Sequence, residues 1–119
     1  EAGLRTSDHL FLPKREQHEA YVGSSIQFQV TSLDGDEMPR FISRCATRGV
    51  ELKWFGASEP VAFTSRYDSW QYFGEVQDLP KTREVLSRTC DMRVPLTFDL
   101  EDCTLISRII CEEIAELAA

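Results

Sequence analysis

The sequence is poor in the residues and patterns that most often mark an active centre. It has two histidines, His9 and His18, and neither lies near a cysteine. Its 6 glycines are isolated and form no G-x-G-x-x-G or G-x-x-x-x-G-K phosphate loop. The patterns H-E-x-x-H and G-x-S-x-G are also missing. These gaps exclude the common signatures of nucleotide-binding loops, zinc proteases and α/β-hydrolases.

Charge and hydropathy narrow the class of protein further. The 119 residues carry a net charge of −7, which disfavours binding to nucleic acid or to an anionic membrane. No apolar run approaches the roughly 20 residues of a membrane span. The first ten residues show no charged segment followed by an apolar one, as a signal peptide would. We therefore expect a cytoplasmic protein with neither nucleic acid nor a membrane as its partner.

The cysteines are few and irregularly spaced, and no two of them form a C-x-x-C pair. Each falls on an apolar stripe, which favours buried free thiols in a reducing compartment. A disulfide pair or a metal site is the alternative. The four residues are Cys45, Cys90, Cys103 and Cys111.

The first half of the chain reads as strand, helix, strand. Residues 25–30 alternate between apolar and polar side chains, which predicts a strand with one buried face. A helix should follow, capped by Asp36 and stopped by Gly49, because apolar residues recur at helical spacing between them. Residues 50–55 alternate again and predict a second strand.

The second half reads as helix, strand, helix. Pro80 suits the first turn of a short helix, and Asp99 is a good N-cap for a long C-terminal one. Between them, every second residue from 90 to 96 is apolar, which predicts a strand that buries Cys90 and Leu96 on one face. Pro95 cannot donate to a strand ladder, so this should be an edge strand or a strand end.

This order of elements predicts an α+β fold. We expect a two-layer sandwich in which helices pack on one face of a small three-stranded mixed sheet. The mixed sheet follows from the first strand–helix–strand unit, whose crossover makes its two strands run in the same direction. We assign residues 24–119 to one domain, and residues 1–23 to a connecting segment that begins as the remnant of a preceding helix.

Two features could carry binding chemistry. The long segment 56–77 is rich in rings and hydrogen-bonding groups, and such loops line ligand pockets or interfaces. Its rings could equally fill the small core. Arg93, on the strand face opposite the core, could grip a carboxylate with its paired donors. It could instead pair locally with Asp91 or an acidic helix residue. The candidate substrate-binding residues are Arg66, Tyr67, Trp70, Tyr72 and Arg93.

Other charged residues have simpler interpretations. Lys53 at a strand end is interpreted as a solvated lysine. Arg40, Arg44 and Arg48 share one helix face, which indicates a solvated side. The pair Glu112 and Glu113 is interpreted as part of a solvent-exposed helix face. No catalytic, cofactor-binding or metal-binding residue is assigned.

Four runs of sequence resemble a known family. They are SSIQFQV, DEMPRFISRCATRGVELKWFG, SRYDSWQYF and LPKTREVLSRTCDMRVPLTFDLEDCTLISRII. Together they resemble the C-terminal small domain of fold-type I, pyridoxal-phosphate-dependent aminotransferases, closest to the DegT/DnrJ/EryC1/StrS group that aminates keto-sugars. The likeness extends from Ser24 to about Glu116.

The resemblance implies a function that this chain cannot perform alone. In that family, the cofactor lysine and the phosphate-binding residues belong to a large domain that would precede Glu1. The small domain closes over the substrate, and it is this movement that excludes water. The resemblance therefore implies a missing large pyridoxal-phosphate domain, a homodimeric parent enzyme and a small-molecule substrate. It also implies that residues 66–72 and Arg93 lie at the mouth of the site.

Two alternatives from other classes remain open. The chain could be a stand-alone α+β module that binds a small ligand or regulates a partner. It could also be a protein-interaction domain that exposes the aromatic residues between Phe63 and Phe73.

Overall fold

The structure is a computed structural model that describes the whole chain except residues 62–65, 67, 69–71 and 73. Its strands are β1 (Leu10–Phe11), β2 (Ser25–Val30), β3 (Lys53–Trp54) and β4 (Thr89–Arg93). Its helices are the 3₁₀ turn η1 (Leu4–Thr6), α1 (Met38–Thr47), α2 (Pro80–Leu86) and α3 (Leu100–Ala118). The α+β class expected from the sequence is confirmed.

The sheet differs in detail from the predicted three-stranded mixed one. The described strands form a four-stranded sheet in the order β1-β2-β4-β3, and every neighbouring pair is antiparallel. The strands β2 and β3 do run in the same direction, because each is antiparallel to β4. They are not neighbours, because β4 lies between them. The predicted parallel pair is therefore split by a strand that comes much later in the chain.

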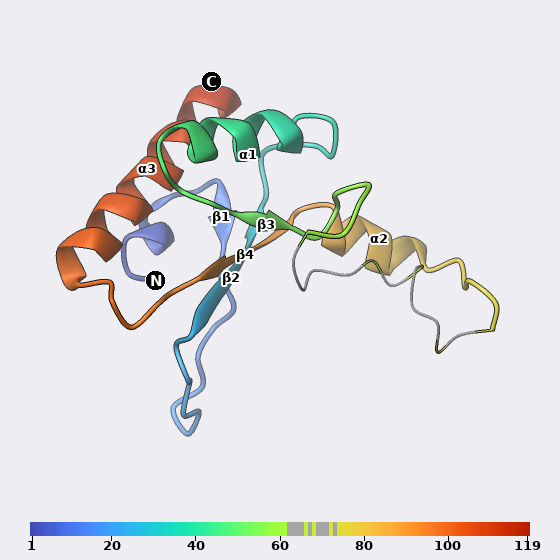
Figure 1. Ribbon diagram of the computed structural model, residues 1–119, viewed down its shortest axis with the longest axis horizontal. Coiled ribbons are helices and arrows are strands. Elements are labelled where there is room, and N and C mark those ends of the chain that lie inside the picture. Colours follow the sequence, from blue (N-terminus) through green and yellow to red (C-terminus); the bar gives the residue numbers. More distant parts are fainter. Residues whose placement is uncertain (62–65, 67, 69–71, 73) are drawn as a thin grey trace.

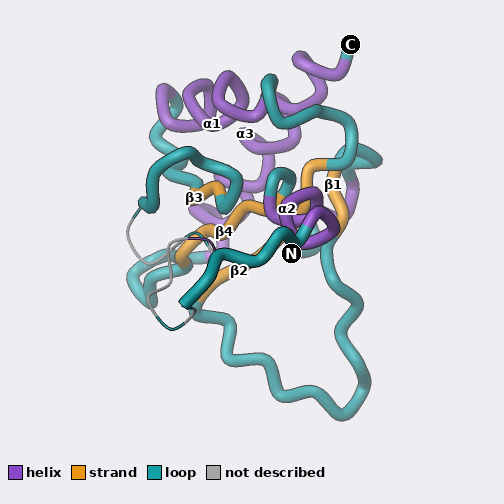
Figure 2. The backbone as a smooth tube through the Cα atoms, turned by 90° about the vertical axis from the view of Figure 1, so that its right-hand side faces the viewer, coloured by secondary structure: helices purple, strands orange, loops and turns teal. Residues whose placement is uncertain are grey.

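One helical layer covers one face of this sheet. In Figures 1 and 2, α1 and α3 lie side by side over the strands, whereas α2 lies apart from them near the start of β4. The core fills the space between sheet and helices. Its largest fully buried side chains are Phe28, Phe41, Leu4, Met38, Ile110 and Ile114.

The N-terminal residues, expected to form a connecting segment, also contribute to this core. Leu4, Leu10 and Leu12 are buried, and Leu10 lies opposite Val30 in the register of β1 and β2. The loop that follows β1 extends away from the body of the molecule (Figure 1). Arg15 anchors it, because its guanidinium binds Glu1 at 2.6 Å.

The helix ends follow the sequence closely, with one exception. Gly49 adopts φ +84° and ends α1, which is the role predicted for it. The carboxylate of Asp99 accepts hydrogen bonds from the first-turn backbone of α3, and the carboxylate of Asp102 accepts one from the amide of Asp99, which completes a capping box. The exception is Asp36, because α1 begins at Met38 after Glu37 and has no side-chain cap.

The prediction of solvated helix faces is wrong for Glu113, whereas Arg40, Arg48 and Glu112 are exposed as expected. Glu113 is buried on α3, and both oxygens of its carboxylate bind arginines of α1. Arg48 Nη1 donates to Glu113 Oε1 at 2.8 Å, and Arg44 Nε donates to the other oxygen. Ion pairs with Arg44 and Arg48 explain why the charged side chain of Glu113 is buried.

The strand β4 is a central strand that ends at Arg93, so Pro95 marks a strand end and not an edge. This early end overturns the prediction for Leu96. The alternation that buries Cys90 and Met92 stops before Leu96, whose side chain is fully exposed. Once the ladder stops, sequence alternation no longer fixes which way a side chain points.

All four cysteines are free, but only two are buried. Cys45 and Cys90 lie in the core, Cys111 is half-buried, and Cys103 is exposed, which corrects the expectation that all four are buried. No helix in the described ranges is long and apolar enough to cross a membrane.

Candidate functional site

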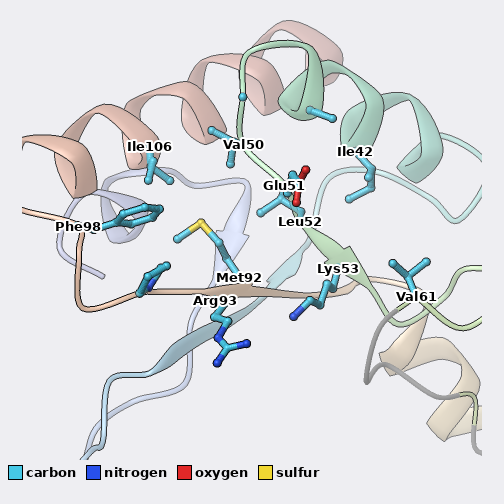
Figure 3. A pocket seen from close by; sticks show the side chains of 13 residues that line it. Ile42, Val50, Glu51, Leu52, Lys53, Val61, Met92, Arg93, Phe98 and Ile106 are labelled. Atoms are coloured by element: carbon cyan, nitrogen blue, oxygen red, sulfur yellow. The ribbon is translucent and has the colours of Figure 1, made fainter.

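A groove of about 650 Å³ opens beside β3, where the sheet meets the helical layer (Figure 3). Its walls are mostly apolar and come from α1, α3, the end of β4 and the segment before β3. Those walls include Ile42, Val50, Leu52, Met92, Phe98 and Ile106. Among the described strands, β3 is the last one in the sheet and is only two residues long, and the groove opens at this corner of the core.

Charged side chains border this groove on the sheet side. Arg93 and Lys53 both point away from the apolar walls in Figure 3, toward the face of the sheet opposite the helices. They come from neighbouring strands, since Lys53 lies opposite Asp91 in the β3–β4 register and Arg93 follows two residues later on the same face. This corner therefore joins an apolar groove to two cations.

Asp91 lies between these cations in the register but is not paired with Arg93. Its side chain is only 1% exposed, and its Oδ2 accepts no hydrogen bond from the described residues. Within that part of the chain there is no ion pair between Asp91 and Arg93. The local pairing considered from the sequence is therefore not formed, and Arg93 remains exposed at the end of β4.

Arg66 lies in a different hollow from Arg93. This smaller hollow is lined by Phe55, Ser87 and the ion pair between Arg66 and Asp68. The guanidinium of Arg66 donates hydrogen bonds to both carboxylate oxygens of Asp68, at 2.8 and 2.5 Å. The hydrogen bond from Arg66 lowers the pKa of Asp68.

The other candidates from the aromatic segment are only partly placed. Tyr72 is 90% exposed and lines neither hollow. Tyr67 and Trp70 lie outside the described residues. Of the five predicted site residues, the structure thus places Arg93 at the large groove and Arg66 at the small one, and it does not bring the two together.

Sequence reasoning missed the groove itself. The sequence pattern indicates only core positions for Ile42, Val50 and Ile106. It does not show that these side chains line a groove beside a short strand at the edge of the sheet. The buried Asp91 was also missed, because alternation placed it on the polar face without showing that a central strand is covered there. No cluster of metal-ligating side chains occurs among the residues with described positions.

Comparison with solved structures finds similarity to an aminotransferase. No protein-family model and no curated protein matches the chain. Among solved structures, the chain is similar to the aminotransferase TlmJ from Streptoalloteichus hindustanus, with a TM-score of 0.73 and 17% sequence identity. The match covers 99% of this chain and 30% of that one. The chain thus has the fold of about a third of an aminotransferase, across its whole length.

Proposed function

We propose that this chain is the smaller, substrate-side lobe of a pyridoxal-phosphate-dependent aminotransferase that acts on a keto-sugar or a similar carbonyl compound. The observation that supports this proposal is the match of nearly the whole chain to one part of a solved aminotransferase. The four runs of sequence that resemble DegT-like small domains agree with it. The activity belongs to the parent protein, because a fold alone does not carry a function.

The residues of this chain do not fit a pyridoxal phosphate site. Such a site needs a lysine next to a cradle for the phosphate, usually at a helix N-terminus. Lys14 is 86% exposed and faces Glu16, and Lys81 is also exposed. Lys53 borders a groove that contains the C-terminal end of α1, where the helix dipole disfavours a phosphate. The proposal therefore places the cofactor on another domain of the parent.

Arg93 is the residue through which this lobe would bind a substrate. It is exposed, lies at the rim of the groove and has no ion-pair partner among the described residues. A guanidinium presents two parallel donors that match a carboxylate, such as that of an amino-acid donor. Arg66, Tyr67, Trp70 and Tyr72 remain proposed contributors to substrate binding, with Arg66 at the smaller hollow.

The proposal is tested on the full-length protein that contains this chain. We expect its purified form to carry the visible absorption of the bound cofactor and to transfer an amino group from an amino acid. Replacing Arg93→Leu should raise the KM for the amino donor at least tenfold, because about 1.4 kcal/mol of charge-assisted binding corresponds to that factor. The kcat should change much less, since Arg93 binds and does not react.

Arg40→Leu is the matched control, because Arg40 is an exposed arginine on α1 that does not line the groove. It should leave the KM unchanged. A full-length protein without any cofactor lysine outside these residues would contradict the proposal. An isolated chain that binds a metabolite selectively would instead favour a stand-alone binding module.

A further inference from the structure

Asp91 is a buried carboxylate that the described residues leave without a hydrogen bond at one oxygen. It lies in the interior strand β4, and its side chain is 1% exposed. Its Oδ2 accepts no hydrogen bond within the described ranges. Burial of a carboxylate without a partner is costly, and buried polar atoms in native proteins rarely stay unpaired. Such an acceptor is typical of a functional position, where a substrate completes the hydrogen bonds.

Asp91 belongs to the polar face of the sheet, opposite the face that packs against the helices. The residues before and after it, Cys90 and Met92, are buried in the core, and alternation turns Asp91 to the other side. Directly opposite it are Gln27 on β2 and Lys53 on β3. Side chains paired in this way have Cβ atoms about 4.5–5.5 Å apart. The carboxylate therefore lies in a row of hydrogen-bonding groups that crosses three strands.

The charges around Asp91 select the chemistry of a ligand at this position. Lys53 lies beside it on β3, and Arg93 lies two residues along on the same face of β4. Two cations beside a single carboxylate disfavour a ligand that presents an ammonium group. A metal ion has no support either, because no cluster of metal-ligating side chains occurs where the chain is described. A hydroxyl group fits, since it is a neutral donor that forms short, strong hydrogen bonds with a carboxylate.

We propose that Asp91 and Gln27 bind two hydroxyl groups of the carbonyl sugar that the parent enzyme aminates. This assignment rests on the proposed function. The amino donor and the carbonyl acceptor of an aminotransferase react in turn at the same place, so one site must recognise both. Arg93 matches the carboxylate of the donor, whereas Asp91 and Gln27 match the hydroxyl groups of the acceptor. Neighbouring residues on one sheet face would thus divide the recognition of two unlike substrates.

A sugar can reach Asp91 without a change in the backbone. Gln27, directly opposite it, and Arg93, two residues along, are both exposed. Both side chains are long, and exposed side chains change rotamer within nanoseconds. Their rotation gives access to the carboxylate while the strands stay paired. The amide of Gln27 then offers a donor and an acceptor beside the carboxylate, which matches neighbouring hydroxyl groups.

Equilibrium binding to the full-length protein tests the assignment without relying on turnover. The probes are D-glucose, a neutral sugar, and L-glutamate, an amino acid of the donor class, and NMR titration measures both dissociation constants. Asp91→Asn keeps the shape of the side chain and removes its charge. It should raise the dissociation constant of D-glucose about tenfold and leave that of L-glutamate within about twofold. Arg93→Leu should do the reverse.

Two controls separate ligand binding from a structural role. Asp8→Asn is the matched variant, because Asp8 is exposed and lies outside the described strands, and it should change neither constant. Without ligand, Asp91→Asn should unfold at the same temperature as the unaltered protein or at a higher one, since it removes a buried unpaired charge. With D-glucose, the unaltered protein should gain more thermal stability than the variant.

Each outcome decides the assignment. If the unaltered protein does not bind D-glucose, or if Asp91→Asn binds it equally well, the assignment is wrong. A lower unfolding temperature of this variant without ligand would give Asp91 a structural role, and weaker binding of L-glutamate would show that it takes the ammonium group. Either result also overturns the assignment. Binding of D-glucose through Asp91 in a full-length protein without pyridoxal phosphate would support the sugar site and refute the proposed function, so that the two failures are distinguishable.

Discussion

Arg48 Nη1 lies 2.8 Å from Oε1 of Glu113, and this bond joins α1 to α3 across 65 residues of sequence. Arg44 binds the other oxygen of the same carboxylate. Glu113 is 5% exposed, so its charge is compatible with burial only because two guanidinium groups satisfy it. This cluster fixes the position of the two helices that form the layer above the sheet.

Replacing Glu113→Gln should lower the free energy of unfolding by roughly 2 kcal/mol, less than the 3–5 kcal/mol typical of fully buried pairs. The effect is smaller because the side chains of Arg44 and Arg48 are 33% and 37% exposed and can be rehydrated. Urea denaturation measures the difference. Glu112→Gln is the matched control, since Glu112 binds Arg48 but is 47% exposed, and it should cost less than about 1 kcal/mol.

The same cluster predicts how stability depends on pH. The hydrogen bond from Arg48, and then that from Arg44, lowers the pKa of Glu113 in the folded state. A lowered folded-state pKa stabilises the protein above the unfolded pKa of about 4.3, and that stability is lost as the pH falls through the folded value. We therefore expect the thermal midpoint to fall as the pH decreases below about 4.3.

The variant Glu113→Gln should show a shallower decrease over the same range of pH. The thermal midpoint of the variant should still decrease somewhat with pH, because Arg15 lowers the pKa of Glu1 and Arg66 lowers that of Asp68. An unchanged slope in the variant would mean that folding does not lower the pKa of Glu113.

The cysteines should differ strongly in their reaction with a thiol reagent. Burial raises the pKa of Cys45 to about 12 and also raises that of Cys90. Cys103 is exposed. In the native protein we expect one rapidly modified thiol, at Cys103, and two that react only on unfolding. Mass spectrometry of the modified protein measures this, and Cys103→Ser should remove the fast reaction.

The capping box of α3 should contribute measurably to stability. Asp99→Ala removes the acceptor for two first-turn amides and should cost about 1 kcal/mol. Glu101→Ala is the control, since its side chain lies in the same turn but accepts no cap bond among the described residues. The midpoint of chemical denaturation reports both. If both substitutions destabilise the protein equally, the loss of stability comes from the interaction with the helix dipole and not from the cap.

Local signals predicted several elements of this chain, although the strand expected at residues 50–55 covers only Lys53–Trp54 and β1 was not expected. The strand from Ser25 to Val30, the proline at the start of α2, the stop at Gly49 and the cap at Asp99 depend on neighbours within a few residues. Backbone conformation and capping act over that distance, so the sequence is sufficient to reveal them.

Contacts between distant segments were not predictable in the same way. The buried position of Glu113 depends on Arg44 and Arg48, which lie more than 60 residues earlier, and a helical stripe alone cannot show this pairing. The exposure of Leu96 depends on β4 ending at Arg93. The groove depends on β3 being both short and last in the sheet, which is a property of strand order.

By itself, the amino-acid sequence determined where the three α-helices and the strand β2 form, because local propensity, period and caps depend on consecutive residues. Only the tertiary structure decided that β4 lies between β2 and β3 and that Arg93 borders an apolar groove. The physical reason is that strand order and burial result from contacts between segments far apart in the chain. The residue pattern of one segment does not show which other segment packs against it.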